Sequence, residues 1–291
     1  MPWDWGISTA KFGNITNGYI HDIFSDASES HIVRCLGAKA DDVDCVVDNI
    51  IIENVFGNAN SLLCIGFQSD ASGRNVAEAT KLGRISLNNI HVNTTGAFVD
   101  MLGSDVYSLT FKNLMSCVCG TNYFFKQNSD YTLNIDELII DGWNNDDNYI
   151  SGEVKRYFTG IIKKLCLRNI ELIENNSSAA SSYPFITLNG NSSIKEDVLV
   201  DNASVYGFNS FINIAKANAV VKIINSCIDA KKSMVICNDA IASLNVKAIN
   251  NDWENTLYFI KNYVSDSSVL ADVCMNEGTS SNIGTVTVTE H

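Results

Sequence analysis

Three charged residues occupy equivalent places in short apolar segments of this 291-residue chain. Arg34, Asp100 and Lys126 are each the third residue of a five-residue segment whose second residue is apolar. If these segments are strands in register, Asp100 and Lys126 lie on one face, about 4.8 Å apart. A carboxylate flanked by cations could perform acid–base chemistry on a sugar, with Asp100 and Lys126 catalytic and Arg34 binding the substrate. The alternative is an ordinary solvated charge pair across two strands.

A second group of candidates lies in the segment 142–158. Asp146 and Asp147 could serve as catalytic carboxylates on a loop above a rigid scaffold. The aromatic residues of the segment, whose rings could stack on sugars, are Trp143, Tyr149 and Tyr157. In the alternative, Trp143 anchors the segment on the core and the tip of the loop is merely polar.

Metal and nucleophile motifs give weaker signals. The run 141–148 is rich in Asp and Asn, but it lacks the glycine at its sixth place and the glutamate at its twelfth that an EF-hand requires. We therefore predict no metal and no cofactor, with calcium the ion that the run would suit best. His21 and Asp22 are adjacent and could form a base and its orienting carboxylate, or could be structural residues of the rim.

A repeat indicates the elements that would hold these residues. The pattern is apolar, any, apolar, any, then Asn or a small residue, as in 50–54 and 198–202. A second short strand with period-2 alternation follows each copy. Asn tolerates the left-handed conformation of a sharp turn, and its amide can bond to the Asn of the next coil. The fifth positions of the pattern are residues 22, 54, 89, 113, 142, 169, 202, 225 and 248.

Repeated short strands without helical periodicity predict a solenoid in which equivalent strands of successive coils pair in parallel. We expect an all-β fold, a single-stranded right-handed parallel β-helix of about nine to ten coils. It should occupy residues 1–263, and residues 264–291 should form a C-terminal cap or a last irregular coil. The N-terminal end has no obvious cap, so we expect that it is truncated or covered by another chain.

The rhythm of the segment 47–54, Val-Asp-Asn-Ile-Ile-Ile-Glu-Asn, resembles that of the pectate-lyase-like parallel β-helix superfamily. This superfamily includes phage tailspikes and polysaccharide depolymerases, and the resemblance extends over residues 12 to 262. It implies the fold and a polysaccharide ligand. The pectinolytic motifs of the superfamily are missing, since no Gly-His-Gly occurs and the prolines are Pro2 and Pro184.

Composition restricts the partner and the compartment. The chain has 20 Lys and Arg against 33 Asp and Glu, a net charge of −13, which argues against nucleic acid and favours a neutral glycan. No apolar run approaches the ~20 residues that span a bilayer. The nine cysteines lack the spacing of metal ligands, so we expect them to be small buried hydrophobic residues. We also expect that the chain is made in a reducing cytoplasm, without a signal peptide. Such a chain would belong to a virion or be an excised part of a larger extracellular protein.

These features predict a tailspike-like depolymerase that binds a polysaccharide or oligosaccharide and cleaves it as a glycoside hydrolase. One alternative is a polysaccharide lyase that uses Lys126 or Arg34 as the base. Another is a non-catalytic structural or adhesive receptor-binding solenoid, either part of a longer parent chain or a homotrimer. The homotrimer would bury a stack of aromatic residues, namely Phe98, Phe124, Phe185, Phe211 and Tyr258.

Overall fold

The computed structural model describes fifteen stretches of the chain as strands and the turns beside them. None of the described residues is helical, so no described helix could cross a membrane. The described residues are 7–8, 15–36, 47–66, 82–102, 105–115, 125–127, 134–144, 161–173, 184–189, 195–216, 218–237, 243–253, 255–264, 268–278 and 281–291.

The described strands form two sheets, and within each sheet every pair of neighbouring strands is parallel. The first sheet has 17 strands. They are β1 (Ile7–Ser8), β2 (Ile15–Leu36), β3 (Val47–Gly66), β4 (Leu82–Thr94), β5 (Val99–Leu102), β6 (Val106–Met115), β7 (Phe125–Gln127), β8 (Asn134–Asn144), β9 (Ile161–Ile173), β11 (Lys195–Tyr206), β13 (Asn218–Ile224), β14 (Cys227–Asp229), β16 (Ser243–Ile249), β17 (Asp252–Trp253), β19 (Ser268–Cys274), β20 (Glu277–Gly278) and β22 (Thr287–Glu290). The second sheet has five, which are β10 (Pro184–Asn189), β12 (Ser210–Lys216), β15 (Ser233–Cys237), β18 (Tyr258–Asn262) and β21 (Asn282–Ile283).

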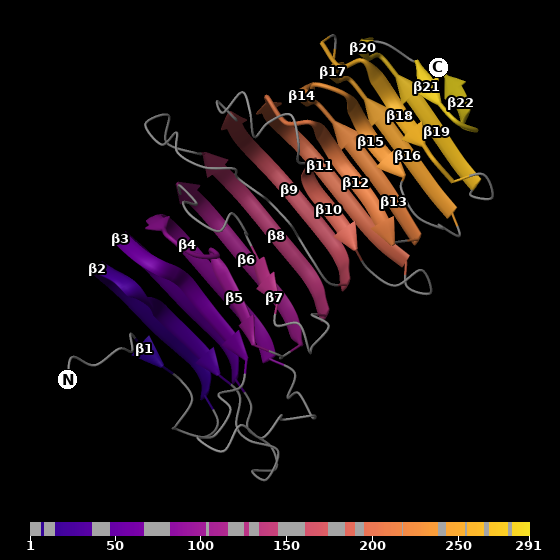
Figure 1. The fold of residues 1–291 in the computed structure, drawn as a ribbon. Helices are drawn as coiled ribbons and strands as arrows, with labels where there is room; N and C mark the ends of the chain where they lie inside the picture. The colour runs from indigo at the N-terminus through magenta and orange to yellow at the C-terminus, as the bar shows by residue number, and fades with distance from the viewer. Residues whose placement is uncertain are drawn as a thin grey trace.

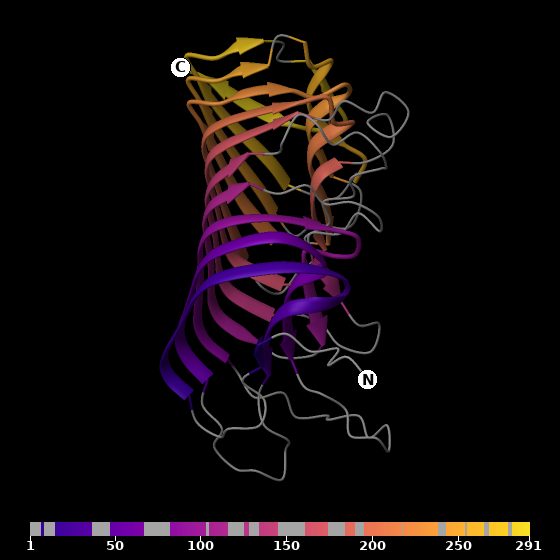
Figure 2. The same ribbon diagram turned by 90° about the vertical axis from the view of Figure 1, so that its left-hand side faces the viewer.

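The strands stack along one axis, each beside its equivalent from the previous coil (Figure 1). Figure 2 shows the same stack from the side, with the strands wound around a common interior. Strand β19 pairs with β16, and β22 pairs with β19, so the last described segments continue the stack. Parallel pairing between segments that are distant in sequence is the architecture of a β-solenoid, which confirms the prediction of an all-β parallel fold.

A residue in the left-handed conformation marks the corner of each coil. Eight of the predicted fifth positions, from Asp22 to Asn225, have positive φ, as expected for a sharp turn that Asn and Gly tolerate. Several successive corners bond to one another, as when Asn89 Nδ2 donates to Asn54 Oδ1 at 2.7 Å, whereas Asn225 donates to Asp201, the residue before a corner. We call this set the asparagine ladder, and its corner residues are Asp22, Asn54, Asn89, Asn113, Gly142, Asn169, Asn202, Asn225, Asn250 and Met275.

One predicted corner was wrong. The repeat placed it at Ala248, but Ala248 is buried and pairs with Ile223, whereas Asn250 has the left-handed φ of 54°. A shift of two residues keeps the same side chains facing inward, so alternation could not distinguish the two registers. The pairing of β13 with β16 determines the register.

The ladder should contribute measurably to stability. Asn202 donates to Asn169 Oδ1 at 2.8 Å and has a φ of 55°. Asn202→Ala should lower the free energy of unfolding by about 2 kcal/mol, because alanine disfavours this φ and loses the hydrogen bond. Asn202→Gly loses only the bond and should cost about 1 kcal/mol or less. Chemical denaturation measures both, and an equal loss in the two variants would show that the left-handed φ contributes nothing.

The interior is a continuous apolar core that runs the length of the stack. It contains Phe98, Phe185 and Phe211, and the rings of Phe185 and Phe211 stack at 5.5 Å with an interplanar angle of 9°. The predicted trimer interface built on these side chains is therefore wrong, since the chain's own core buries them. Tyr258 is partly exposed, and Phe124 lies outside the described residues. A trimer formed through another surface stays a prediction.

Candidate functional site

The row predicted for Arg34, Asp100 and Lys126 exists in the backbone pairing. Arg34 pairs with Cys64, Cys64 with Asp100, and Asp100 with Lys126. Between Arg34 and Asp100 the row contains Cys64, whose neighbour Ile65 is buried in the core. The side chains of Arg34, Asp100 and Lys126 lie outside the described part of the structure, so their catalytic and binding roles stay predictions.

Trp143 does not offer its ring to a sugar. It is 1% exposed, pairs in register with Leu114 and Ile170, and packs on Phe185 at 6.1 Å. Trp143 therefore anchors the segment on the core, as the alternative proposed. The prediction that Trp143 binds substrate is wrong. The other candidates of this segment lie outside the described residues, namely Asp146, Asp147, Tyr149 and Tyr157.

His21 and Asp22 make the contact expected of a base and its orienter. His21 Nδ1 lies 2.8 Å from Asp22 Oδ2, and this bond lowers the pKa of Asp22 below its usual value. Asp22 also accepts Asn54 Nδ2 at 2.8 Å, so it is the first residue of the ladder. Both side chains stand on an open surface, with no described cavity beside them in which a substrate could be enclosed.

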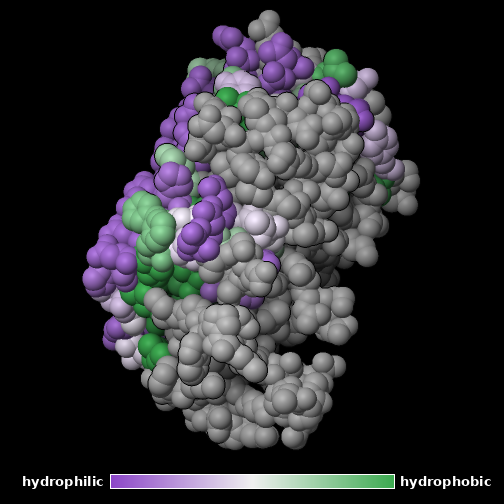
Figure 3. Space-filling view, turned by 60° about the vertical axis from the view of Figure 1, so that its left-hand side comes forward, coloured by the Kyte–Doolittle hydropathy of each residue, from purple (hydrophilic) through white to green (hydrophobic). Residues whose placement is uncertain are grey.

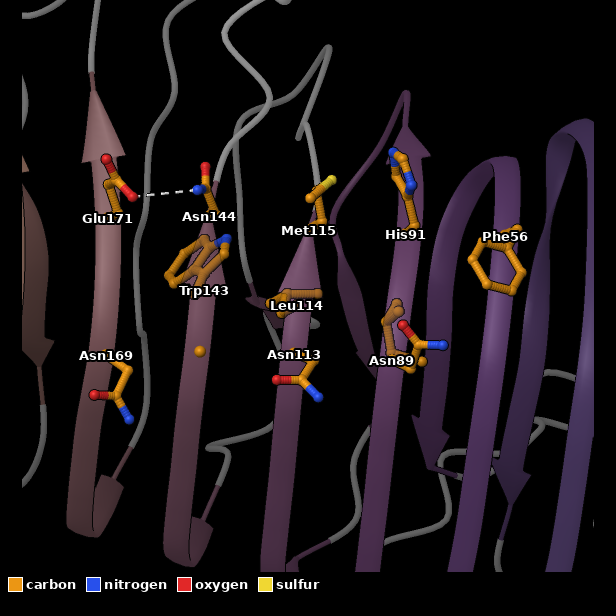
Figure 4. A pocket seen from close by; sticks show the side chains of 12 residues that line it. Phe56, Asn89, His91, Asn113, Leu114, Met115, Trp143, Asn144, Asn169 and Glu171 are labelled. Carbon is orange, nitrogen blue, oxygen red and sulfur yellow. Dashed lines mark hydrogen bonds between the residues drawn. The ribbon is translucent and has the colours of Figure 1, made fainter.

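A groove of about 340 Å³ runs along the corners of five successive coils, from β3 to β9 (Figure 4). We call it the corner groove. In Figure 3, hydrophobic side chains gather toward the lower left of the view, beside hydrophilic side chains of the described residues. The residues that line the corner groove are Phe56, Asn89, Ile90, His91, Asn113, Leu114, Met115, Gly142, Trp143, Asn144, Asn169 and Glu171.

One wall of the corner groove takes one side chain from each coil. Figure 4 shows these side chains in a line, and we call them the outer row. Strands about 4.8 Å apart make the row about 19 Å long, over four steps. Register pairing joins its members in the order Phe56, His91, Met115, Asn144 and Glu171.

The outer row combines apolar and polar chemistry. Phe56 is 40% exposed and meets the His91 ring edge to face at 6.5 Å, while Met115 is 42% exposed. Asn144 Nδ2 donates to Glu171 Oε2 at 3.4 Å, which orients both side chains. Of the described residues that line the corner groove, Glu171 is the one acid.

The other wall is formed by the asparagine ladder. Asn89, Asn113 and Asn169 present their amides there, and Gly142 stands between the last two without a side chain. Beneath them the buried side chains of Leu114 and Trp143 support the strands. The sequence carried a signal for the groove, because each member of the outer row follows a fifth position by two residues. Without the register of the strands, the sequence did not show that the residues two positions after each corner, and not those at another offset, would line a groove.

The described residue with the most perturbed carboxyl group lies away from this groove. Glu196, at the start of β11, is 0% exposed, and burial raises its pKa to about 7. Its Oε1 accepts the Ile162 N–H at 3.1 Å, and no described group bonds to Oε2. Since no solvent reaches it, we assign Glu196 a role in stability. In the described stretches, no group of three or more His, Cys, Asp or Glu residues is placed to hold a metal ion.

Comparison with known proteins adds no assignment. No protein-family model matches the chain, and no curated protein or solved structure matches it significantly. The function must therefore be inferred from the geometry of the chain itself.

Proposed function

We propose that this protein binds an extended neutral glycan in the corner groove. The observation that carries the proposal is the outer row, in which five coils present five side chains along about 19 Å. Sugar rings have apolar faces and a rim of hydroxyl groups. Phe56 and Met115 offer apolar contact to the faces, whereas Asn144 and Glu171 offer hydrogen bonds to the hydroxyls.

The charge of the chain supports a neutral ligand. The net charge is −13, and Glu171 lies in the corner groove itself. A polyanionic chain would meet like charge both at long range and on contact. A neutral oligosaccharide of several sugars meets neither, and it follows the straight line of the row.

We also propose the finer assignment of the fold, a right-handed coil of the pectate-lyase-like superfamily. Parallel crossover connections are almost always right-handed, which supports the handedness. The corner residues from Asp22 to Met275, one for each coil, support a count of about nine to ten coils. We propose that the chain is made in a reducing cytoplasm and belongs to a virion or to a larger extracellular protein. The thiols of Cys166, Cys227, Cys237 and Cys274 are free, which supports a reducing origin.

Cleavage of the bound glycan is the second candidate function. Glycoside hydrolysis requires two carboxyl groups, and Glu171 of the corner groove could be one of them. Asp146 and Asp147 follow the groove residue Asn144 by two and three positions in sequence and could supply the other. In the row of β5 and β7, Asp100 and Lys126 are the alternative pair for hydrolysis, and Lys126 or Arg34 could be the base of a lyase.

Replacing Phe56 tests the groove. Phe56→Ala should weaken glycan binding about tenfold, because the contact of an aromatic ring with a sugar face is worth about 1.4 kcal/mol. Tyr263→Ala, which removes an exposed aromatic residue immediately after β18, is the matched control and should bind as the parent does. Titration calorimetry against a panel of neutral oligosaccharides and polysaccharides measures both.

The products of the same incubations separate the proposed activities. New reducing ends without ultraviolet absorbance indicate a hydrolase, and an absorbing unsaturated sugar indicates a lyase. Binding without any product supports the adhesive alternative. If Phe56→Ala and Tyr263→Ala bind equally well, the corner groove is not the binding site.

A further inference from the structure

The asparagine ladder is interrupted inside the corner groove. Where it is regular, the amide of each corner bonds to a neighbouring coil, and Asn54 both donates to Asp22 and accepts from Asn89. At the corner of β8 the residue is Gly142, with a φ of 80° and no side chain. On the far side of this gap, Asn169 Nδ2 donates to Asp141 Oδ1 at 2.6 Å.

Asn113 stands on the near side of the gap. Its side-chain amide bonds to no residue in the described part of the chain, unlike the amides of the other corner asparagines. Figure 4 shows Asn113 and Asn169 at the same level on the strands that flank β8. Among the described residues, the groove therefore contains an amide whose donor and acceptor are unused, next to a corner that lacks a side chain.

The gap has the position of one amide side chain. A Cβ on Gly142 would lie 3.3 Å from Asn113 Oδ1, a tight contact, so the amide oxygen of Asn113 leans over the bare corner and a group in the groove meets it there. In the complete steps on either side, an amide N–H of the later coil donates to the Oδ1 of the earlier coil at 2.7–2.8 Å. A ligand group there satisfies Asn113 by donating a hydrogen bond to Oδ1, and a planar amide that donates an N–H reproduces the bond of the complete steps.

We propose that an acetamido group of the bound glycan fills this gap and takes the place of the missing ladder amide. The inference rests on the proposed glycan binding and names its class, a neutral polymer that contains N-acetylated amino sugars. The acetamido N–H donates to Asn113 Oδ1, and the acetamido carbonyl, which points the opposite way in a trans amide, accepts from a neighbouring amide. The methyl group meets the apolar lining of Leu114 and Met115. A hydroxyl at the same place would supply neither the plane nor the methyl.

Two matched hexasaccharides test the inference. Chitohexaose and cellohexaose differ only in that each sugar of the first carries an acetamido group where the second carries a hydroxyl. Titration calorimetry should show chitohexaose bound about five- to tenfold more tightly, the ratio expected for one additional net hydrogen bond. Equal affinities, or binding confined to glycans without acetamido groups, would overturn the inference and leave the proposed function intact. If no glycan of the panel binds, the proposed function fails, and the inference with it.

Variants of the gap separate its role from general binding. Gly142→Asn places the protein's own amide at this corner, where the left-handed φ of 80° must fall toward the 51–56° of the corner asparagines, and should make the two hexasaccharides bind equally. Asn113→Ala removes the acceptor and should have the same effect. Asn225→Ala is the matched control, since its φ is 51° against 52° at Asn113 and it lies outside the groove, so the preference should survive. Full preference for chitohexaose in both Gly142→Asn and Asn113→Ala would place the acetamido site elsewhere.

Discussion

Phe185→Ala should lower the free energy of unfolding by about 3–5 kcal/mol, the cost of removing a large aromatic side chain from a packed core. Phe185 is 0% exposed and joins the two sheets. Its ring stacks on Phe211 at 5.5 Å, packs on Phe208 at 5.1 Å and meets Trp143 of β8 at 6.1 Å. Alanine leaves a cavity among three aromatic neighbours that the strands on either side cannot close.

Equilibrium denaturation at two protein concentrations measures this loss and tests the correction to the trimer hypothesis. Because the chain's own core buries Phe185, the loss should be the same at both concentrations. Tyr263→Ala, at a side chain that is 61% exposed, should change the free energy by less than about 0.5 kcal/mol. A loss in Phe185→Ala that depends on protein concentration would instead place the side chain in an interface between copies.

Glu196 should make the protein less stable as the pH rises from about 4.5 to about 7. The carboxyl of the unfolded chain ionises near the ordinary glutamate pKa of 4.5, and the folded carboxyl ionises near 7 because burial disfavours the anion. Between these values the folded state binds the proton more strongly, so raising the pH favours unfolding. The stabilisation from the protonated Glu196 carboxyl is fully present below pH 4.5. Above pH 7 the free energy of unfolding is lower by about 3 kcal/mol.

Glu196→Gln should remove this part of the pH dependence and be the more stable protein above pH 7. Glutamine keeps the acceptor for the Ile162 N–H and carries no charge at any pH. Denaturation of the parent and the variant across this pH range measures the difference between them. Glu277→Gln, at an exposed glutamate of β20, is the control and should follow the parent. Parallel pH curves for the parent and Glu196→Gln would show that the buried carboxyl contributes nothing.

Much of the fold could be predicted from local rules. Alternating apolar residues indicated strands, and a polar residue at a constant offset indicated a corner, because few residue types adopt a left-handed φ. Asn54 and Asn202 are corners for this reason. The same rules failed at Ala248, where a shift of two residues satisfied them equally well and only pairing with Ile223 excluded it.

The candidate site could be predicted far less well. Asp100 and Lys126 were placed as register neighbours, since their strands follow corners at similar distances along the chain. Trp143 was given two roles, and its burial beside Leu114 and Ile170 chose between them. The residue that follows a corner is buried in the neighbouring coils, as Leu114 and Ile170 are, so Trp143 faces inward in the same register.

Local sequence patterns were enough to predict a stack of parallel strands with polar corners. Alternation and left-handed residues are local properties, and a residue's neighbours in the chain largely specify them. Only the tertiary structure brought Phe56, His91 and Glu171 into one row and left a gap at Gly142 beside Asn113. The segments between corners differ in length, so the residues that meet across coils are set by strand pairing and not by any constant spacing in the chain.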